Sequence, residues 1–525
     1  MFKMLHLFPI LALLFNLVVA GHTVARPGGA KDIIVTAKDT TNTTNVPFVK
    51  LAYGSDSAGQ LDLSLTNNLG SDNVNAYVSG LDISGKLVML GSDGEWYYPT
   101  AGTSGIPEPV VANISIPLGG PGTTTNVTLP SYLVSGRVWF ADGTLQFFTV
   151  PGAAGPALVQ PSAANPADPN AAVNWGFVEL TNIPTGIWAN VSYVDFLGLP
   201  LGMTLVGAGG TQTAIGVSAD AVTGVCQKLT QRAKNSGLPW DQLCVSDEAG
   251  DILRVLSPAL HTSVDPTAFK GLFKAYINKV WTRFTTMPLT IDTQTGLGMV
   301  NCTVSKNLMT CDGDSTTYAK PTAYDIFGCN SGPFLIRNTN PIHLAVVPRI
   351  CAAFNRGTLM LPRGNVQPRV PPSRYYTTTP TNFYSQLVKS FEIDGRGYSF
   401  SYDDVTPTGG DDKSGLLADG KPLNLAITIG GLKPSALKPS PTSTTTTTQA
   451  ATATASSVRE NQVKKAAAAK ASKAAAAKAS KAAAAKASKA AAAKASKAAA
   501  AKVSKAAAAK ASKAKAAKAA RKTAS

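Results

Sequence analysis

The chain has 525 residues, of which 44% are hydrophobic and 15% charged, and its formal net charge is +17. This length accommodates more than one domain at about 100 to 200 residues each. Residues 459–525 contain seventeen Lys and two Arg against one Glu, a charge of +18, so the difference leaves −1 on residues 1–458. The composition therefore excludes a basic body: the body is neutral and the tail is basic.

Residues 1–20 have the pattern of a secretory signal peptide. A short basic start, Met1 to Lys3, precedes an apolar run that ends in small residues before Gly21. A membrane anchor is the alternative, but the run is shorter than the ~20 residues of a spanning helix. We therefore expect a secreted protein, extracellular or in a cell wall, with no membrane span.

Glycosylation sequons and cysteines agree with secretion. The sequons are at Asn42, Asn113, Asn126, Asn190 and Asn301, and the cysteines are Cys226, Cys244, Cys302, Cys311, Cys329 and Cys351. Six cysteines allow 15 pairings, and short loops favour bonding between neighbours, in the order just given. A metal site is disfavoured, because there is no C-x-x-C motif or nearby His pair. We expect neither a metal nor a cofactor.

Between about residues 31 and 210, short apolar runs alternate with Gly, Pro, Asn and Thr clusters, a pattern that predicts a β-barrel or sandwich. The stretch LVSGRVWFADGTLQFFTV at 133–150 is interpreted as a hairpin, with Asp142-Gly143 as its turn.

The period changes between about 211 and 290. Asp265 as cap and Pro266 in the first turn predict a helix whose apolar stripe runs from Phe269 to Phe284. Strand-like runs then return up to 432. We expect a mainly β protein with a mixed α/β lobe at about 211–370, return strands at 371–432, and a wide cleft between the lobes.

The C-terminal region has low complexity. Residues 433–458 are a Ser/Thr/Pro linker, and residues 459–525 repeat the motif KAAAAKAS. Each repeat advances about 80° around a helix, so lysines spread over all sides and no apolar face forms. We expect this tail to bind polyanions such as acidic wall polymers, and secretion argues against nucleic acid. A solvated extension with no partner is the alternative.

Few catalytic groups remain in the body. Histidines beyond the N-terminal region are His261 and His343, the cysteines are expected to be bridged, and neither G-x-S-x-G nor a phosphate-binding Gly-rich loop occurs. Carboxylates are left, and two acting together are the machinery of glycoside hydrolysis.

Two carboxylates lie in a window that lacks basic residues. No Lys or Arg occurs between Val138 and Gln227, so any ion pair must come from outside this window. Glu179 lies among aromatic residues, which favour a protonated general acid by desolvation. Asp195 is the candidate general base, with Ser192 and Tyr193 as expected hydrogen-bonding neighbours. Two solvated surface acids are the alternative interpretation.

Several stretches resemble the glycoside hydrolase family 64 β-1,3-glucanases, whose fold is similar to that of thaumatin-like proteins. They are WGFVELT, GIWANVSYVDFLGLPLGM, NSGLPWDQLC and GYSFSYDDV, and the resemblance covers roughly residues 30–432. It implies an inverting endo-type enzyme on β-1,3-glucan, with Glu179 as acid and Asp195 as base, sixteen residues apart and just before the G-x-P-x-G stretch at 198–202.

The resemblance also implies substrate-binding residues. The family's binding Thr falls on Thr181 and its cleft Trp on Trp188, whereas Ile183 stands where an Asn is expected and Asn182 lies one position earlier. Trp188 and Tyr193 are candidates for stacking on sugar rings; Trp175 is equally well explained as core.

Three further residues are interpreted from their positions in the sequence: Asn190, Asp403 and Asp404. A glycan on Asn190 would crowd the groove, so that sequon is either unmodified or points away. We interpret Asp403 and Asp404 as structural turn carboxylates.

Strand geometry constrains the acid pair. A tight hairpin at 182–186 would place residue 179 opposite roughly 189, leaving Asp195 about 20 Å away at ~3.3 Å per residue. An inverting pair must lie about 6.5 to 9.5 Å apart, so we expect a wide loop or a different pairing. The remaining function classes are a monomeric glucanase, a catalytically inactive glucan-binding relative, and a wall protein whose tail is the functional part.

The tail hypothesis predicts a salt effect. Full-length protein should bind a phosphate-bearing wall fraction at low salt and be released at high salt, because exposed charges are screened, and deletion of residues 459–525 should abolish this retention. Sedimentation with the wall fraction measures it. Retention on the wall fraction that is unchanged by high salt and by the deletion would rule out an electrostatic role for the tail.

Overall fold

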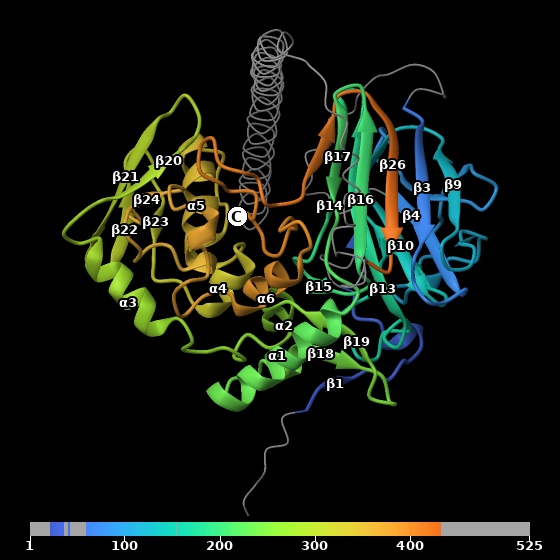
Figure 1. Ribbon diagram of the computed structural model, residues 1–525, viewed down its shortest axis with the longest axis horizontal. Helices are drawn as coiled ribbons and strands as arrows, with labels where there is room; N and C mark the ends of the chain where they lie inside the picture. The colour runs from blue at the N-terminus through green and yellow to red at the C-terminus, as the bar shows by residue number, and fades with distance from the viewer. Residues whose placement is uncertain (1–20, 36–39, 42–58, 154, 432–525) are drawn as a thin grey trace, which may run out of the picture. The chain divides into compact units, whose positions relative to one another are not determined.

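The computed structural model of the chain describes residues 21–35, 40–41, 59–153 and 155–431 (Figure 1). The expected signal peptide, the Asn42 sequon, the linker and the repeat tail lie outside these residues. None of the described helices combines the length and apolar character that a bilayer span requires.

Two large sheets form the first lobe, on the right in Figure 1. The eight-stranded sheet has the order β25 (Leu417–Asp419), β14 (Gly186–Val191), β13 (Asn174–Ile183), β10 (Leu133–Asp142), β4 (Val74–Leu81), β5 (Leu87–Leu90) and β6 (Trp96–Tyr97), with β8 (Ile116–Pro117) on β4. The five-stranded sheet has the order β17 (Gly210–Ala214), β16 (Leu201–Gly207), β26 (Pro422–Ile429), β3 (Leu61–Asn67) and β9 (Thr124–Leu129).

Alternating side chains explain how the five-stranded sheet faces the core. Every second residue of β3, from Leu61 to Asn67, is buried, and β26 alternates in the same way, as expected for strands with one face covered. β3 and β26 pair in parallel, so the last described strand lies beside one of the first. Both sheets are open in the strand orders that the structure describes. The β-rich lobe is thus confirmed, but a closed barrel is wrong.

The predicted hairpin at 133–150 is also wrong. Its turn does end β10, and Gly143 has φ 117°, a conformation that favours glycine. However, β11 (Phe148–Gly152) pairs with β12 (Gly155–Val159) and β7 (Glu108–Pro109), not with β10. β2 (Thr40–Thr41) completes this small sheet.

The second lobe combines helices with a five-stranded sheet and a small connecting sheet. The five-stranded sheet has the order β23 (Thr317–Tyr318), β22 (Leu308–Cys311), β21 (Met299–Ser305), β20 (Leu289–Asp292) and β24 (Val366–Gln367). The connecting sheet contains β1 (Thr23–Val24), β18 (Cys244–Ser246), β19 (Ile252–Leu256) and β15 (Phe196–Leu197). The helices are α1 (Ala221–Ser236), α2 (Pro258–Val264), α3 (Lys274–Arg283), α4 (Ala323–Gly328), α5 (Pro341–Arg356) and α6 (Phe383–Phe391).

The predicted helix after Asp265 begins later than expected. Residues 266–273 form turns, and α3 starts at Lys274. Gly271 has φ +89°, which no α-helix contains, so the helical stripe is interrupted there. Phe269 and Phe273 are nevertheless buried, because the turns pack against the same core.

Three disulfides join helices and strands of this lobe to their neighbours. Cys226–Cys244 joins α1 to β18, Cys302–Cys311 joins β21 to β22, and Cys329–Cys351 joins the end of α4 to α5. This is the pairing that the sequence separation favours. Such bonds stabilise a fold mainly by restricting the unfolded chain.

A buried cluster of charges holds the segment 398–404 against α5 and α6. The Asp403 carboxylate lies 3.0 Å from Arg356 Nη2 and 3.2 Å from Lys389 Nζ, and Lys389 Nζ lies 3.4 Å from Glu392 Oε1. Burial alone would raise the pKa of Asp403, but Lys389 and Arg356 bring it below its ordinary value. The structural role expected for Asp403 agrees with this geometry.

Glu392 predicts a pH dependence of stability. Burial raises its pKa from 4.5 to about 7, although the Lys389 ammonium acts in the opposite direction. Because the folded state holds the proton more tightly, the stability contributed by Glu392 is complete below about pH 4.5 and is lost as the pH rises through about 7. Relative to wild type, Glu392→Gln should therefore gain roughly 1 to 3 kcal/mol of unfolding free energy across this range.

Urea unfolding at three pH values measures this gain. The pKa of about 7 already includes the effect of Lys389. A change in packing adds an offset that does not vary with pH, so the test is how the difference in unfolding free energy between variant and wild type changes with pH. Glu248→Gln, at a side chain that is 77% exposed, is the control and should show a flat difference. A flat difference for Glu392→Gln as well would contradict the burial argument.

Candidate active site

The hairpin β13–β14 presents polar side chains on one face. Glu179 is paired with Asn190, and Thr181 with Trp188, across the two strands. Directly opposed residues of antiparallel strands point to the same face. This face therefore carries the predicted acid beside the predicted stacking residue.

The hairpin itself is tight, so both parts of the expectation, a wide loop or a different pairing of these strands, are wrong. Ile183 pairs with Gly186, and Glu179 faces a position close to the one that a tight turn predicts. Asp195 is nevertheless not part of this strand, because β14 ends at Val191. Residues 192–195 form an isolated bridge and a bend, and β15 (Phe196–Leu197) then pairs with β19 in another sheet.

Packing of the segment that follows Asp195 fixes its place beside the start of β13. The Phe196 ring centroid lies 4.5 Å from that of Trp175, and the Leu199 amide donates to the Trp175 carbonyl at 3.2 Å. A Cβ at Gly198 would lie 2.1 Å from that carbonyl oxygen, so only glycine allows the approach. The first glycine of the GLPLG stretch thus lets the chain pack against the start of β13, with Asp195 three residues before it.

Both acids line one cavity of about 360 Å³. Its near wall consists of Glu179, Ser192, Val194 and Asp195. Its far wall comes from the second lobe, with Gly328, Cys329, Asn330, Tyr398, Ser401 and Tyr402. The two walls are joined by backbone, since the Tyr193 amide donates to the Tyr398 carbonyl at 2.7 Å. The cavity therefore lies between the lobes, where the sequence predicted a cleft.

Glu179 is not in an uncharged environment, contrary to the sequence-based expectation. The Arg137 Nη2 atom lies 3.0 Å from Glu179 Oε1, and Arg137 Nη1 donates to Gln160. The guanidinium also lies over the Phe177 ring at 4.3 Å. Arg137 is the residue immediately before the window without basic residues, and strand pairing of β10 with β13 places it opposite Glu179.

Asp195 is enclosed from the other side. It lines a second cavity of about 30 Å³ together with Arg137, Gln160 and Trp175. Its backbone carbonyl accepts a hydrogen bond from the Ser257 amide at 2.8 Å, which ties the acid to the start of α2. Trp175 is 1% exposed, so its interpretation as core holds and it has no free face for a sugar.

Two of the predicted substrate-binding residues lie on the Glu179 face of the hairpin, and the other two are buried. Trp188 is 39% exposed, and Thr181 is half-buried on the same face, where its hydroxyl accepts from the Ser135 amide at 3.3 Å. Asn182 is 2% exposed on the opposite face and donates to the Gly59 carbonyl at 2.8 Å, so its predicted substrate contact loses its geometric support. Tyr193 is 2% exposed, so the expectation that its ring stacks on a sugar is wrong.

The sequons differ in their surroundings. Asn113, Asn126 and Asn301 are exposed. Asn190 is half-buried on the Glu179 face, and its buried Oδ1 atom has no hydrogen-bond partner within the described residues. Of the two readings left open for this sequon, the structure favours an unmodified side chain.

Neither described histidine of the second lobe offers nucleophilic chemistry. His343 is fully buried; its Nδ1 lies 2.8 Å from the Tyr318 hydroxyl and 3.2 Å from Asp314, and its Nε2 accepts from the Arg337 amide. Both ring nitrogens are thus engaged in the fold. Burial lowers the pKa of His261, in agreement with a structural role.

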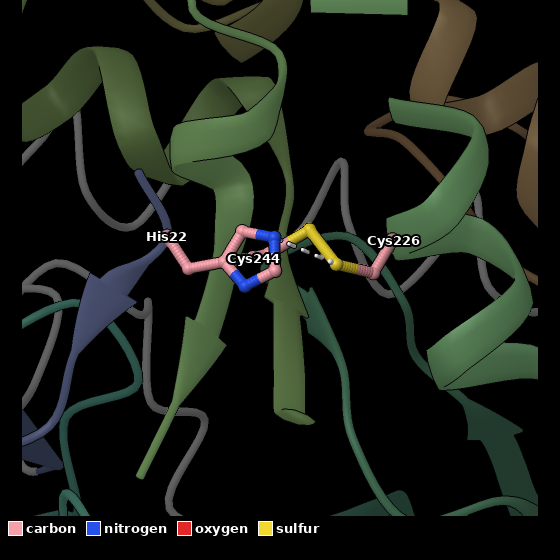
Figure 2. Close-up of side chains that lie close together, drawn as sticks. All are labelled: His22, Cys226 and Cys244. Carbon is pink, nitrogen blue, oxygen red and sulfur yellow. Dashed lines mark hydrogen bonds between the residues drawn. A yellow bond between two sulfur atoms is a disulfide. The ribbon is translucent and has the colours of Figure 1, made fainter. Parts of the chain in front are cut away.

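One group within the described residues has ligand atoms close enough to hold a metal ion, within 4.8 Å of one another. It consists of His22, Cys226 and Cys244, and Figure 2 shows the imidazole beside the Cys226–Cys244 disulfide. Metal binding by cysteine requires thiolates, and a disulfide has none. The contact of His22 Nε2 with Cys226 Sγ, at 3.7 Å, belongs to the packing of the N-terminal segment.

The site contains residues that sequence reasoning missed. Arg137, Gln160 and Asn330 had no local signal, because each lies far along the chain from the acid it accompanies. Tyr398 and Tyr402 lie within GYSFSYDDV, one of the stretches that carried the resemblance. The sequence therefore identified this stretch as similar to the family, but it did not predict that Tyr398 and Tyr402 line the far wall of the cavity.

A family model matches most of the chain. Residues 59–429 match the model of glycoside hydrolase family 64, described as β-1,3-glucanase. Two curated relatives, both glucan endo-1,3-β-glucosidases, come from Cellulosimicrobium cellulans and Arthrobacter sp. (strain YCWD3) and are 25% and 26% identical over 314 residues. The match covers 58% of this chain and 54% of each relative, so the chain spans about half the length of these relatives.

Solved structures show a similar fold. A laminaripentaose-producing β-1,3-glucanase, crystallised with laminaritetraose, has a TM-score of 0.61 and 27% identity, over 71% of this chain and 98% of that chain. A family 64 β-1,3-glucanase domain from Clostridium beijerinckii has a TM-score of 0.55 and 21% identity, over the same shares of the two chains, and supports the fold alone.

The Arg137–Glu179 contact predicts a measurable coupling. Arg137→Met keeps the aliphatic stem over Phe177 but removes the charge, and Glu179→Gln removes the other charge. A double-mutant cycle should give about 0.5 to 1 kcal/mol of unfolding free energy, as for a partly exposed pair, and less in high salt. The Arg26–Glu248 pair, at 3.8 Å and 77% exposed on both sides, should give almost none. Equal couplings for the two pairs would contradict the role assigned to Arg137.

Proposed function

The chain belongs to glycoside hydrolase family 64, and on that premise we propose that it hydrolyses β-1,3-glucan by an inverting mechanism, with Glu179 as general acid and Asp195 as general base. The observation that carries the proposal is that both carboxylates line the same cavity between the lobes. Two carboxyl groups on either side of a scissile bond are the machinery of glycoside hydrolysis.

Glu179 supplies the proton in this proposal. Because Arg137 holds Oε1, Oε2 is the oxygen that can carry the proton and give it to the glycosidic oxygen. The contact also fixes the plane of the carboxyl group, since the guanidinium is itself held by Gln160 and Phe177. A donor fixed in this way needs little reorganisation when it reacts.

Asp195 accepts the proton of the attacking water. The water oxygen forms a bond to the anomeric carbon while the bond from that carbon to the leaving oxygen breaks. Glu179 then ends the step ionised and Asp195 protonated, and the anomeric configuration is inverted. A cavity of about 360 Å³ has room for a sugar residue and the water beside it.

The rest of the cleft binds the polysaccharide. The exposed ring of Trp188 is the proposed platform for a pyranose face, and Thr181 lies directly across the strands from it. On the opposite wall, Tyr398, Tyr402 and Asn330 offer hydrogen-bonding groups. Cleavage inside the glucan chain, as in the names of the curated relatives, is part of the proposal.

We extend the proposal to location and fold. The apolar N-terminus, the sequons and three disulfides support secretion. The lysine-rich residues 459–525 support attachment to acidic wall polymers. The sandwich beside a mixed lobe supports the relationship to thaumatin-like proteins.

A glucan-binding protein without activity is the alternative. Loss of either acid would favour it, but both acids are present and meet in one cavity. Hydrolysis is therefore the better supported reading.

Reducing-sugar release from laminarin and curdlan tests the acid pair. Glu179→Gln and Asp195→Asn should each lower the rate by about 10² to 10⁴. Asp62→Asn, at an exposed strand carboxylate bonded to Thr128, is the matched control and should keep full activity. Activity that survives either active-site change overturns the assignment, and wild type that binds glucan without cleaving it supports the alternative.

The anomer of the first product tests inversion separately. Proton NMR at early times should show the α-anomer, because direct attack by water inverts a β-linkage. Release of the β-anomer would leave hydrolysis intact but overturn the role of Asp195 as base.

A further inference from the structure

A separate cavity lies in the helical lobe, and it shares no lining residue with either cavity beside Asp195. It has a volume of about 230 Å³ and lies between α1, the residues that follow α1, and the start of α6. Arg232, Trp240, Thr379, Thr381 and Gln386 supply its polar groups. No Asp or Glu is among its lining residues.

The Trp240 indole carries a buried donor without an acceptor. The side chain is 1% exposed, and within the described residues its Nε1 atom has no hydrogen-bond partner. Leaving a buried donor unsatisfied costs about 1 to 3 kcal/mol, so most such groups in folded proteins are paired. A donor of this kind beside a cavity indicates an acceptor that comes from outside the chain.

Arg232 adds a positive charge that nothing in the described part of the chain neutralises. Its Nε atom is buried without a partner, and its guanidinium forms no ion pair there. The charged group instead lies over the Phe383 ring, at 5.2 Å from the centroid. That contact holds the guanidinium in place and leaves its charge available, because an aromatic face does not neutralise a cation as a carboxylate does.

We propose that this cavity binds a small oxyanion, a phosphate or carboxylate group, with Arg232 as the counter-charge and Trp240 Nε1 as a fixed donor. The hydroxyls of Thr379 and Thr381 and the amide of Gln386 orient the remaining oxygens. The volume is several times that of one water, about 30 Å³, and admits either a free anion or an acidic monosaccharide. Oxyanions pair strongly with a guanidinium because its planar fork of N–H donors matches them.

Isothermal titration calorimetry on the full chain tests the site, with inorganic phosphate, D-glucuronate and neutral D-glucose as probes at constant ionic strength. Arg232→Gln should weaken binding of the preferred anion about 10- to 100-fold, and Trp240→Phe, which keeps a ring but removes the donor, about fivefold. Tighter binding of phosphate assigns the site to a free anion, and tighter binding of glucuronate to an acidic sugar.

Arg283→Gln is the matched control. Like Arg232, Arg283 lies on a helix, has a buried Nε without a partner among the described residues and lies over a phenylalanine ring, at 5.9 Å, but it lines neither this cavity nor that of the two acids. It should leave the affinity unchanged. Anion binding to the lysine-rich tail is common to all variants, so it cancels in the comparison.

Three outcomes would overturn the proposal. They are no heat with either anion, equal affinity in Arg232→Gln and wild type, and glucose binding as tightly as glucuronate. Circular dichroism melting of each variant shows whether it is folded. If Trp240→Phe does not fold, the comparison of Arg232→Gln with Arg283→Gln still decides.

Discussion

The candidate site depends on the contact of residues 196–199 with Trp175 at the start of β13. Phe196 packs edge-on against Trp175, the Leu199 amide bonds to the Trp175 carbonyl, and Gly198 lets the two backbones approach. A side chain at position 198 would push this segment off the strand. Asp195 would then move away from Glu179, because it lies only three residues before that glycine. A packing contact between aromatic rings therefore sets the position of a charged group.

The far wall of the cavity depends on the second lobe in a different way. Tyr398, Ser401 and Tyr402 lie on a segment with little regular structure, whose position is fixed by buried charges. Asp403 is held by Arg356 and Lys389, and burying such charges is costly unless they are paired. The Cys329–Cys351 disulfide fixes the neighbouring part of the wall. Stability and site geometry are therefore coupled through the same residues.

Arg137 shows why the charged environment of a side chain cannot be predicted from its sequence neighbours alone. Within the sequence, Glu179 has only apolar and polar neighbours, and the nearest upstream basic residue is 42 positions away. Strand pairing removes that separation, because β10 lies directly beside β13. Hydrophobic neighbours in the sequence therefore do not establish a desolvated carboxyl when an adjacent strand can supply a charge. The same reasoning explains the hairpin at 133–150, whose two halves join different sheets.

The sequence alone determined the features that depend on nearby residues. These are the β-rich lobe, the mixed lobe and its three disulfides between neighbouring cysteines. The sequence also identified an exposed Trp188 and the two candidate acids, and short stretches of it carried the family resemblance. Tertiary structure decided what depends on distant residues: the packing after Asp195 that sets this acid beside the cavity, the Arg137 contact, the burial of Asn182 and Tyr193, and the delayed start of α3. The physical reason is that periodicity, caps and turn residues act over a few positions. Strand partners and ring packing instead act across the fold, where sequence separation carries no information about distance.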